Sequence, residues 1–128
     1  MKSRDSLIRL KRFHADEKRR QVAQIEAMIA EFERMAKELD DQIVAEQERS
    51  GIHDVGHFAY PTFAKAAMQR RDNLKTSAED LKAQLAAAVA ERDAAVAELE
   101  KAEAIAERDN MAEKSTGHTG PHRVAAAR

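Results

Sequence analysis

The chain has 128 residues, of which 35% are charged and 4% are aromatic, and its net charge is -1. This length fits one domain, and so small a net charge argues against a protein that binds nucleic acid through bulk electrostatics. The absence of Cys excludes disulfides and thiolate catalysis.

No apolar run approaches the ~20 residues that a membrane span needs. The opening segment, MKSRDSLIRLKRF, lacks the apolar region of a secretory signal peptide. We therefore expect the protein to stay in the cytoplasm.

The first predicted element is a long helix over residues of about 3–49. Ser3 can cap it, and Asp5 suits the positive end of the helix dipole. Its apolar residues recur at heptad spacing, in the order Val22, Ile25, Ile29, Phe32, Ala36, Leu39 and Ile43. The same register continues upstream through Ile8, Lys11, Ala15 and Lys18, so the seam becomes polar toward the N-terminus. Gly51 is predicted to end the helix in a left-handed conformation.

The second predicted helix covers residues of about 61–114, with Pro61 in its first turn. Its seam is predicted to contain Phe63, Ala67, Leu74, Ala78, Leu81, Leu85, Ala88 or Val89, Val96, Leu99 and Ala106. We interpret residues 115–128, which hold two Gly and one Pro, as a flexible tail.

Charge blocks favour an antiparallel pairing of the two helices. Residues 1–20 carry a net charge of +5 and residues 77–114 a net charge of -5. Residues 21–50 carry -5, and residues 51–76 carry +2. Surface ion pairs are individually weak, but they discriminate between topologies that have equal cores. The predicted fold is therefore all-α, an antiparallel coiled-coil hairpin over residues 1–114 with its turn near residues 50–60.

The turn segment, SGIHDVGHFAYP, concentrates unusual residues, and with Phe63 it holds three of the five aromatic side chains. One interpretation is that Phe58, Tyr60 and Phe63 contact a protein partner, since aromatic residues dominate interface energetics. The alternative is that they plug the end of the hairpin, with Phe63 in the seam.

The sequence predicts no enzyme, metal site or cofactor. His53 and His57 are four residues apart, and His118 and His122 repeat that spacing, but both pairs lie in segments that contain Gly. We expect them to be solvent-exposed without metal, because HExxH and any third ligand are absent. A two-helix hairpin also lacks the concavity that catalysis requires.

The N-terminal block is strongly basic. It contains Lys2, Arg4, Arg9, Lys11, Arg12, Lys18, Arg19 and Arg20. One interpretation is a solvated helix end that is paired within the molecule. The others are an acidic protein partner, an anionic membrane surface and, least favoured, nucleic acid.

Two segments of the chain resemble a known family. The stretch MKSRDSLIRLKRFHADEKRRQVAQIEAMIAEFERMAKELD, followed by HFAYPTFAKAAMQRRDNLK, is similar to the flagellar export protein FliJ of alphaproteobacteria. The resemblance covers roughly residues 1–114. It implies an antiparallel two-helix coiled coil that is a non-enzymatic, monomeric part of the flagellar type III export apparatus, at the inner membrane of the flagellar base.

The resemblance also implies partners. These are the export ATPase FliI, the cytoplasmic domain of the export gate FlhA, and export chaperones, with no nucleic acid and only peripheral membrane contact through the gate. It assigns the ATPase contact to Arg9, Arg12, Arg19 and Arg20, and the gate contact to Phe58, Tyr60 and Phe63. The alternative is a homo-oligomeric coiled-coil scaffold or adaptor unrelated to flagellar export.

Overall fold

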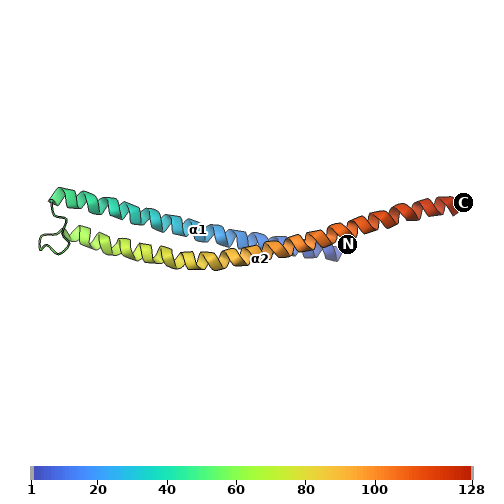
Figure 1. The fold of residues 1–128 in the computed structure, drawn as a ribbon, viewed down its shortest axis with the longest axis horizontal. Helices are drawn as coiled ribbons and strands as arrows, with labels where there is room; N and C mark the ends of the chain where they lie inside the picture. Colours follow the sequence, from blue (N-terminus) through green and yellow to red (C-terminus); the bar gives the residue numbers. More distant parts are fainter. Residues whose placement is uncertain (1, 128) are drawn as a thin grey trace. The chain divides into compact units, whose positions relative to one another are not determined.

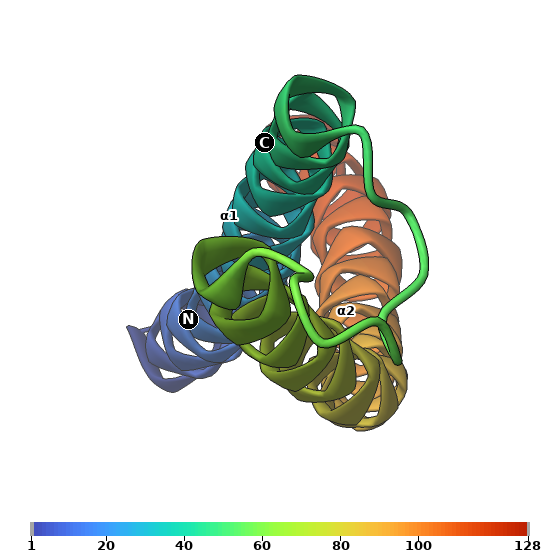
Figure 2. The same cartoon turned by 90° about the vertical axis from the view of Figure 1, so that its left-hand side faces the viewer.

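The computed structural model describes the backbone of residues 2–127 and the side chains of residues 3–115. Within this range the protein contains two α-helices and no strand. Helix α1 spans Lys2–Ser50 and α2 spans Thr62–Ala127, and the loop of residues 51–61 joins them (Figures 1 and 2). The prediction of an all-α helical hairpin is confirmed.

Helix α1 ends where the sequence predicts. Gly51 has a φ of 73°, in the left-handed region that favours glycine. Its amide donates a 2.8 Å hydrogen bond to the carbonyl of Gln47, which satisfies one of the last carbonyls of the helix. The chain can therefore leave the helix axis immediately after Ser50.

The contacts divide the chain into two compact units. The loop-proximal unit consists of residues 20–89, and the terminal unit consists of residues 1–19 and 90–128. Each unit contains a segment of α1 and an antiparallel segment of α2, and within the unit these two segments lie side by side (Figure 1).

The loop-proximal unit is held together by the predicted heptad seam. Leu39, Ile43 and Ala67 form its central cluster, against which Met68 and Leu74 pack. Buried residues of this seam also include Val22, Ile29, Ala36, Ala64, Ala78, Leu81 and Ala88.

Phe63 was wrongly assigned to the seam, since 54% of it is exposed. The buried α2 positions begin instead at Ala64 and continue through Ala67, and that register leaves Phe63 at the flank of the seam.

The terminal unit has a thinner seam. Ala15, Ala95 and Leu99 form its buried cluster, and Ile8 and Val96 pack against them. Because two of the three buried residues are alanines, apolar burial per helical turn is small here. Lys11 and Lys18, which the predicted register places in this part of the seam, have side chains that are 33% and 20% exposed.

Helix α2 continues to Ala127, beyond the end expected near residue 114. The flexible tail predicted for residues 115–128 falls almost wholly on residues whose side chains lie outside the described range, and so does the His118 and His122 pair. Over the described residues, neither helix combines the length and the apolar character that crossing a lipid bilayer would demand.

Candidate functional site

The loop between the helices is held by a series of local hydrogen bonds. The Gly56 amide donates to Asp54 Oδ1 at 3.0 Å, and the His57 amide donates to the Asp54 carbonyl at 3.0 Å. The amide of Ala59 donates to His57 Nδ1 at 3.0 Å, and that of Tyr60 donates to the His57 carbonyl at 3.0 Å. These bonds give the loop one defined path, because each closes a turn of only a few residues.

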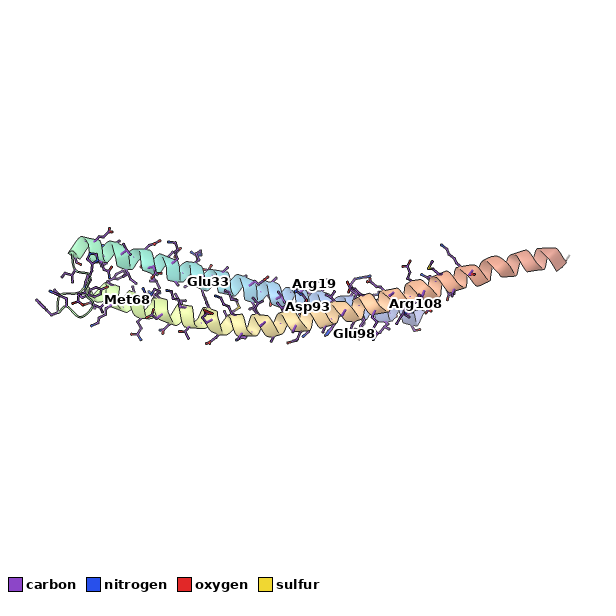
Figure 3. All side chains as sticks on the ribbon, in the orientation of Figure 1. Arg19, Glu33, Met68, Asp93, Glu98 and Arg108 are labelled. Atoms are coloured by element: carbon purple, nitrogen blue, oxygen red, sulfur yellow. The ribbon has the colours of Figure 1, made fainter. Side chains whose placement is uncertain are left out.

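Tyr60 anchors the loop to the helices. Only 7% of it is exposed, and Gln47 Nε2 donates a 2.8 Å hydrogen bond to its hydroxyl oxygen. The hydroxyl in turn donates to Met68 Sδ at 3.6 Å, and Met68 lies on α2 close to the loop (Figure 3). Tyr60 is therefore a plug between α1 and α2. The prediction that Tyr60 contacts a partner is corrected, because its ring is buried between the helices and is not accessible to a partner.

Phe58, two residues earlier, is in the opposite situation. It is 97% exposed, and its ring stacks on that of His57 with centroids 4.8 Å apart and an interplanar angle of 21°. Leaving a phenylalanine in water forgoes roughly 1.5–3 kcal/mol of burial. A ring that is exposed on a hydrogen-bonded loop is already ordered before any partner arrives, which lowers the entropic cost of binding.

Two open grooves lie beside this loop. One, of about 450 Å³, is lined by Gln42, Ala45, Glu46, Arg49 and Phe63. The other, of about 350 Å³, is lined by Val55, Lys65, Met68, Gln69, Asp72 and Asn73. Phe63 and Val55 are 54% and 38% exposed, so the wall of each groove contains one exposed large apolar side chain. Phe58 and Phe63 remain as the two accessible members of the predicted aromatic set.

The predicted basic block lies in the terminal unit as far as Arg19, and four of its cations pair with carboxylates of α2. The cross-helix ion pairs are Arg4–Asp109 at 2.8 Å, Lys11–Glu98 at 3.5 Å, Arg12–Glu103 at 3.0 Å and Lys18–Glu91 at 2.7 Å. The hydrogen bond from Arg4 to Asp109 raises the pKa of Arg4, and a second hydrogen bond to Glu113 raises it further. The hydrogen bond from Lys18 lowers the pKa of Glu91. The predicted match between the basic start of α1 and the acidic part of α2 is confirmed.

The residues predicted to contact the ATPase are therefore mostly engaged within the molecule. Arg12 pairs with Glu103 and Arg19 with Asp16, and Arg20 also has a partner. Arg9 is exposed and has no partner among the described residues. Arg9, Arg12 and Arg19 lie in the terminal unit, whereas Arg20 belongs to the loop-proximal unit. Among the described residues, Arg9 is the one of the four that is left uncommitted.

The sequence analysis missed a set of exposed apolar residues on the first turns of α1. Leu7, Leu10 and Phe13 are 46%, 62% and 63% exposed. The signal was present, because the register through Ile8, Lys11 and Ala15 places Leu10 and Phe13 at outward heptad positions.

The described residues bring no three His, Asp or Glu side chains together in a way that could hold a metal ion. His53 and His57 are exposed, as predicted, and His57 Nδ1 accepts the Ala59 amide.

Comparison with known proteins gives no match to a protein-family model, to a curated protein or to a solved structure. The functional interpretation therefore depends on the residues of this chain and on the resemblance to the FliJ family.

Proposed function

We propose that this protein is a non-enzymatic component of a bacterial flagellar type III export apparatus. In this role it couples the export ATPase FliI to the cytoplasmic domain of the export gate FlhA and assists export chaperones. The proposal is supported by the two segments that resemble FliJ and by the helical hairpin, which is the fold that the resemblance implies.

The observation that carries the proposal is the exposure of Phe58. The loop is fastened to the helices through Tyr60, its backbone is hydrogen-bonded, and yet it leaves one aromatic ring 97% exposed. Exposed aromatic side chains on ordered segments are typical anchors of protein interfaces. Phe58 lies in the HFAYP segment, which is one of the two specific parts of the resemblance.

We assign the gate contact to Phe58 together with Phe63, and not to Tyr60. The groove beside Phe63 can accept an apolar side chain of the gate, since Ala45 and Phe63 form part of its wall. The ATPase contact is assigned to the basic face of the terminal unit, with Arg9 as its uncommitted cation. The protein acts as a monomer in the cytoplasm and reaches the inner membrane at the flagellar base through the gate.

The test is binding of the purified full-length protein to the cytoplasmic domain of FlhA and, separately, to FliI. We expect Phe58→Ala to weaken gate binding by about tenfold or more, as the loss of a central aromatic contact does. Its helicity and its binding to FliI should not change, because Phe58 packs against no helix. Met28→Ala is the matched control, since Met28 is 46% exposed and lies about six turns of α1 before the loop.

Equal gate binding by wild type and Phe58→Ala would overturn the assignment of the contact. Failure of the wild type to bind both FlhA and FliI would overturn the export function itself. A dimer whose mass does not change with concentration would then favour the homo-oligomeric scaffold.

A further inference from the structure

The terminal unit carries exposed apolar side chains that the gate and ATPase assignments do not use, although Arg9 beside them also belongs to the proposed ATPase contact. We define the apolar patch as Leu7, Leu10, Phe13 and Ile105, which are 46%, 62%, 63% and 42% exposed. Leu10 and Phe13 occupy outward heptad positions of α1, and Leu7 occupies the flank of the seam.

Ile105 belongs to the same surface. Arg4 pairs with Asp109 and Lys11 pairs with Glu98, so the part of α2 opposite Leu7 lies between residues 98 and 109. Ile105 is the exposed large apolar residue of that segment, and its register places it on the flank that faces the Leu7 side. The patch therefore spans both helices of the unit.

Uncommitted cations surround the patch. Arg9 lies on α1 next to Leu10, and Lys101 and Arg108 lie on α2 one turn to either side of Ile105 (Figure 3 labels Arg108). All three are exposed, and none has an ion-pair partner among the described residues. Residues 6–15 contain no carboxylate, and the register of α2 places the exposed Glu100 and Glu107 on the flank opposite Ile105. The occupant of this surface should thus be apolar and anionic.

We propose that the apolar patch and its cations form a docking surface for an anionic lipid membrane. A basic helical segment with exposed Leu and Phe is the pattern of helices that lie in the membrane interface. The long stems of Arg9, Lys101 and Arg108 let the cations reach headgroup phosphates while the apolar residues enter the acyl boundary. A second copy of the chain fits poorly, because a symmetric contact would bring these cations against each other.

The geometry also favours a membrane over a protein helix. Leu10 and Phe13 project outward from α1, and so they form a convex ridge instead of the walls of a groove. The deformable, planar surface of a membrane can accommodate such a ridge, whereas a partner helix normally binds in a concave apolar groove.

The test is flotation of the full-length protein with vesicles of phosphatidylcholine that contain phosphatidylglycerol, and with vesicles of phosphatidylcholine alone. We expect the protein to float with the anionic vesicles at physiological ionic strength and not with the neutral ones. Leu10→Ser/Phe13→Ser should lower the partition coefficient by about tenfold or more, because both side chains lose their apolar contact. Lys101→Gln/Arg108→Gln should also lower the partition coefficient, and the partition coefficient of this variant should depend less on salt concentration.

Met28→Ser/Val44→Ser is the matched control. Met28 and Val44 are 46% and 50% exposed and lie in the loop-proximal unit, so their replacement removes exposed apolar surface without touching the patch. Flotation of this control and of Phe58→Ser should equal that of the wild type. Circular dichroism checks that every variant keeps its helicity.

Three outcomes would overturn the proposal. They are failure of the wild type to float with anionic vesicles, full flotation of Leu10→Ser/Phe13→Ser, and an equal loss of flotation in the control. Binding only to a synthetic helical peptide built from Leu and Glu would assign the surface to an acidic protein helix instead. None of these outcomes bears on gate binding, because Phe58 is not part of the patch.

Discussion

Two aromatic residues that are two positions apart in the loop have opposite environments. Tyr60 is 7% exposed and Phe58 is 97% exposed. The difference arises from the path of the loop, because the turn closed by the Tyr60 amide and the His57 carbonyl directs one ring between the helices and the other into solvent. Tyr60 thus fastens the loop to the helices, and the fastened loop exposes Phe58 to solvent.

This division of roles predicts a small and separable effect for Tyr60→Phe. The variant keeps the buried ring but leaves Gln47 Nε2 without its 2.8 Å acceptor, so the free energy of unfolding should fall by about 1 kcal/mol. Urea denaturation followed by circular dichroism measures this change.

Tyr60→Ala also removes the buried ring, so it should lower the free energy of unfolding by about 3 kcal/mol or more. If Tyr60→Ala and Phe58→Ala destabilised the protein equally, the assignment of Tyr60 as the plug would be wrong.

At the scale of the helices, the seam changes character along α1. Leu39 and Ile43 fill it in the loop-proximal unit, whereas Lys11 and Lys18 occupy the heptad position of Leu39 in the terminal unit. The two lysines reach Glu98 and Glu91 at the flank of α2, at 3.5 and 2.7 Å. Polar residues at seam positions lower stability but specify register and partner.

Lys11→Leu/Lys18→Leu should therefore stabilise the protein. Both side chains are already partly buried, with 33% and 20% of their area exposed, so leucines at these positions would gain apolar burial. The stability gained from this burial should exceed the stability lost with the two surface ion pairs, so the free energy of unfolding should rise by about 1 kcal/mol. Thermal melting measures the shift, and light scattering should reveal oligomers, because the register is less strongly specified.

Lys37→Leu is the control for this variant. The Lys37 side chain is 76% exposed and pairs with Asp41 on the same helix, so the substitution should add no burial. A lower melting temperature for Lys11→Leu/Lys18→Leu would contradict the account, since the ion pairs would then outweigh the burial.

The sequence could predict the helices and most of their seam, because apolar residues of long helices repeat at heptad spacing wherever they pack. The prediction failed at Phe63, where the helix has just begun and no upstream turn fixes the register. The burial of Tyr60 could not be predicted either. It depends on a bond to Gln47, across the loop, which is a tertiary contact that periodicity does not encode.

On the scale of the whole molecule, charge distribution specifies how α1 and α2 pair. Cross-helix ion pairs occur in both units, such as Lys18–Glu91 in the terminal unit and Arg71–Asp40 in the loop-proximal unit. Within each unit, a basic block of one helix thus faces an acidic block of the other helix. Sequence alone allowed this prediction, because a parallel pairing would place like charges together.

The same ion pairs predict how stability depends on pH. The hydrogen bond from Lys18 lowers the pKa of Glu91 below its ordinary value of 4.5, so the folded protein holds this carboxylate ionised more firmly than the unfolded chain does. A lowered pKa stabilises the fold above the unfolded value, and that contribution is lost as the pH falls through the folded value.

Glu91→Gln should therefore melt at a lower temperature than the wild type at neutral pH. The difference should shrink as the pH falls below 4.5. Thermal melts at a series of pH values provide the measurement. A difference that stays constant into acid would show that Glu91 acts through packing and not through its charge.

The central claim is that one molecule joins the export ATPase to the export gate, and assembly of the ternary complex tests it most directly. We expect wild-type protein, FliI and the cytoplasmic domain of FlhA to co-elute as one complex in size-exclusion chromatography with light scattering. Phe58→Ala should leave only the complex with FliI, because we assign the ATPase contact to the terminal unit. If each partner displaced the other from the wild-type protein, coupling by simultaneous binding would be contradicted.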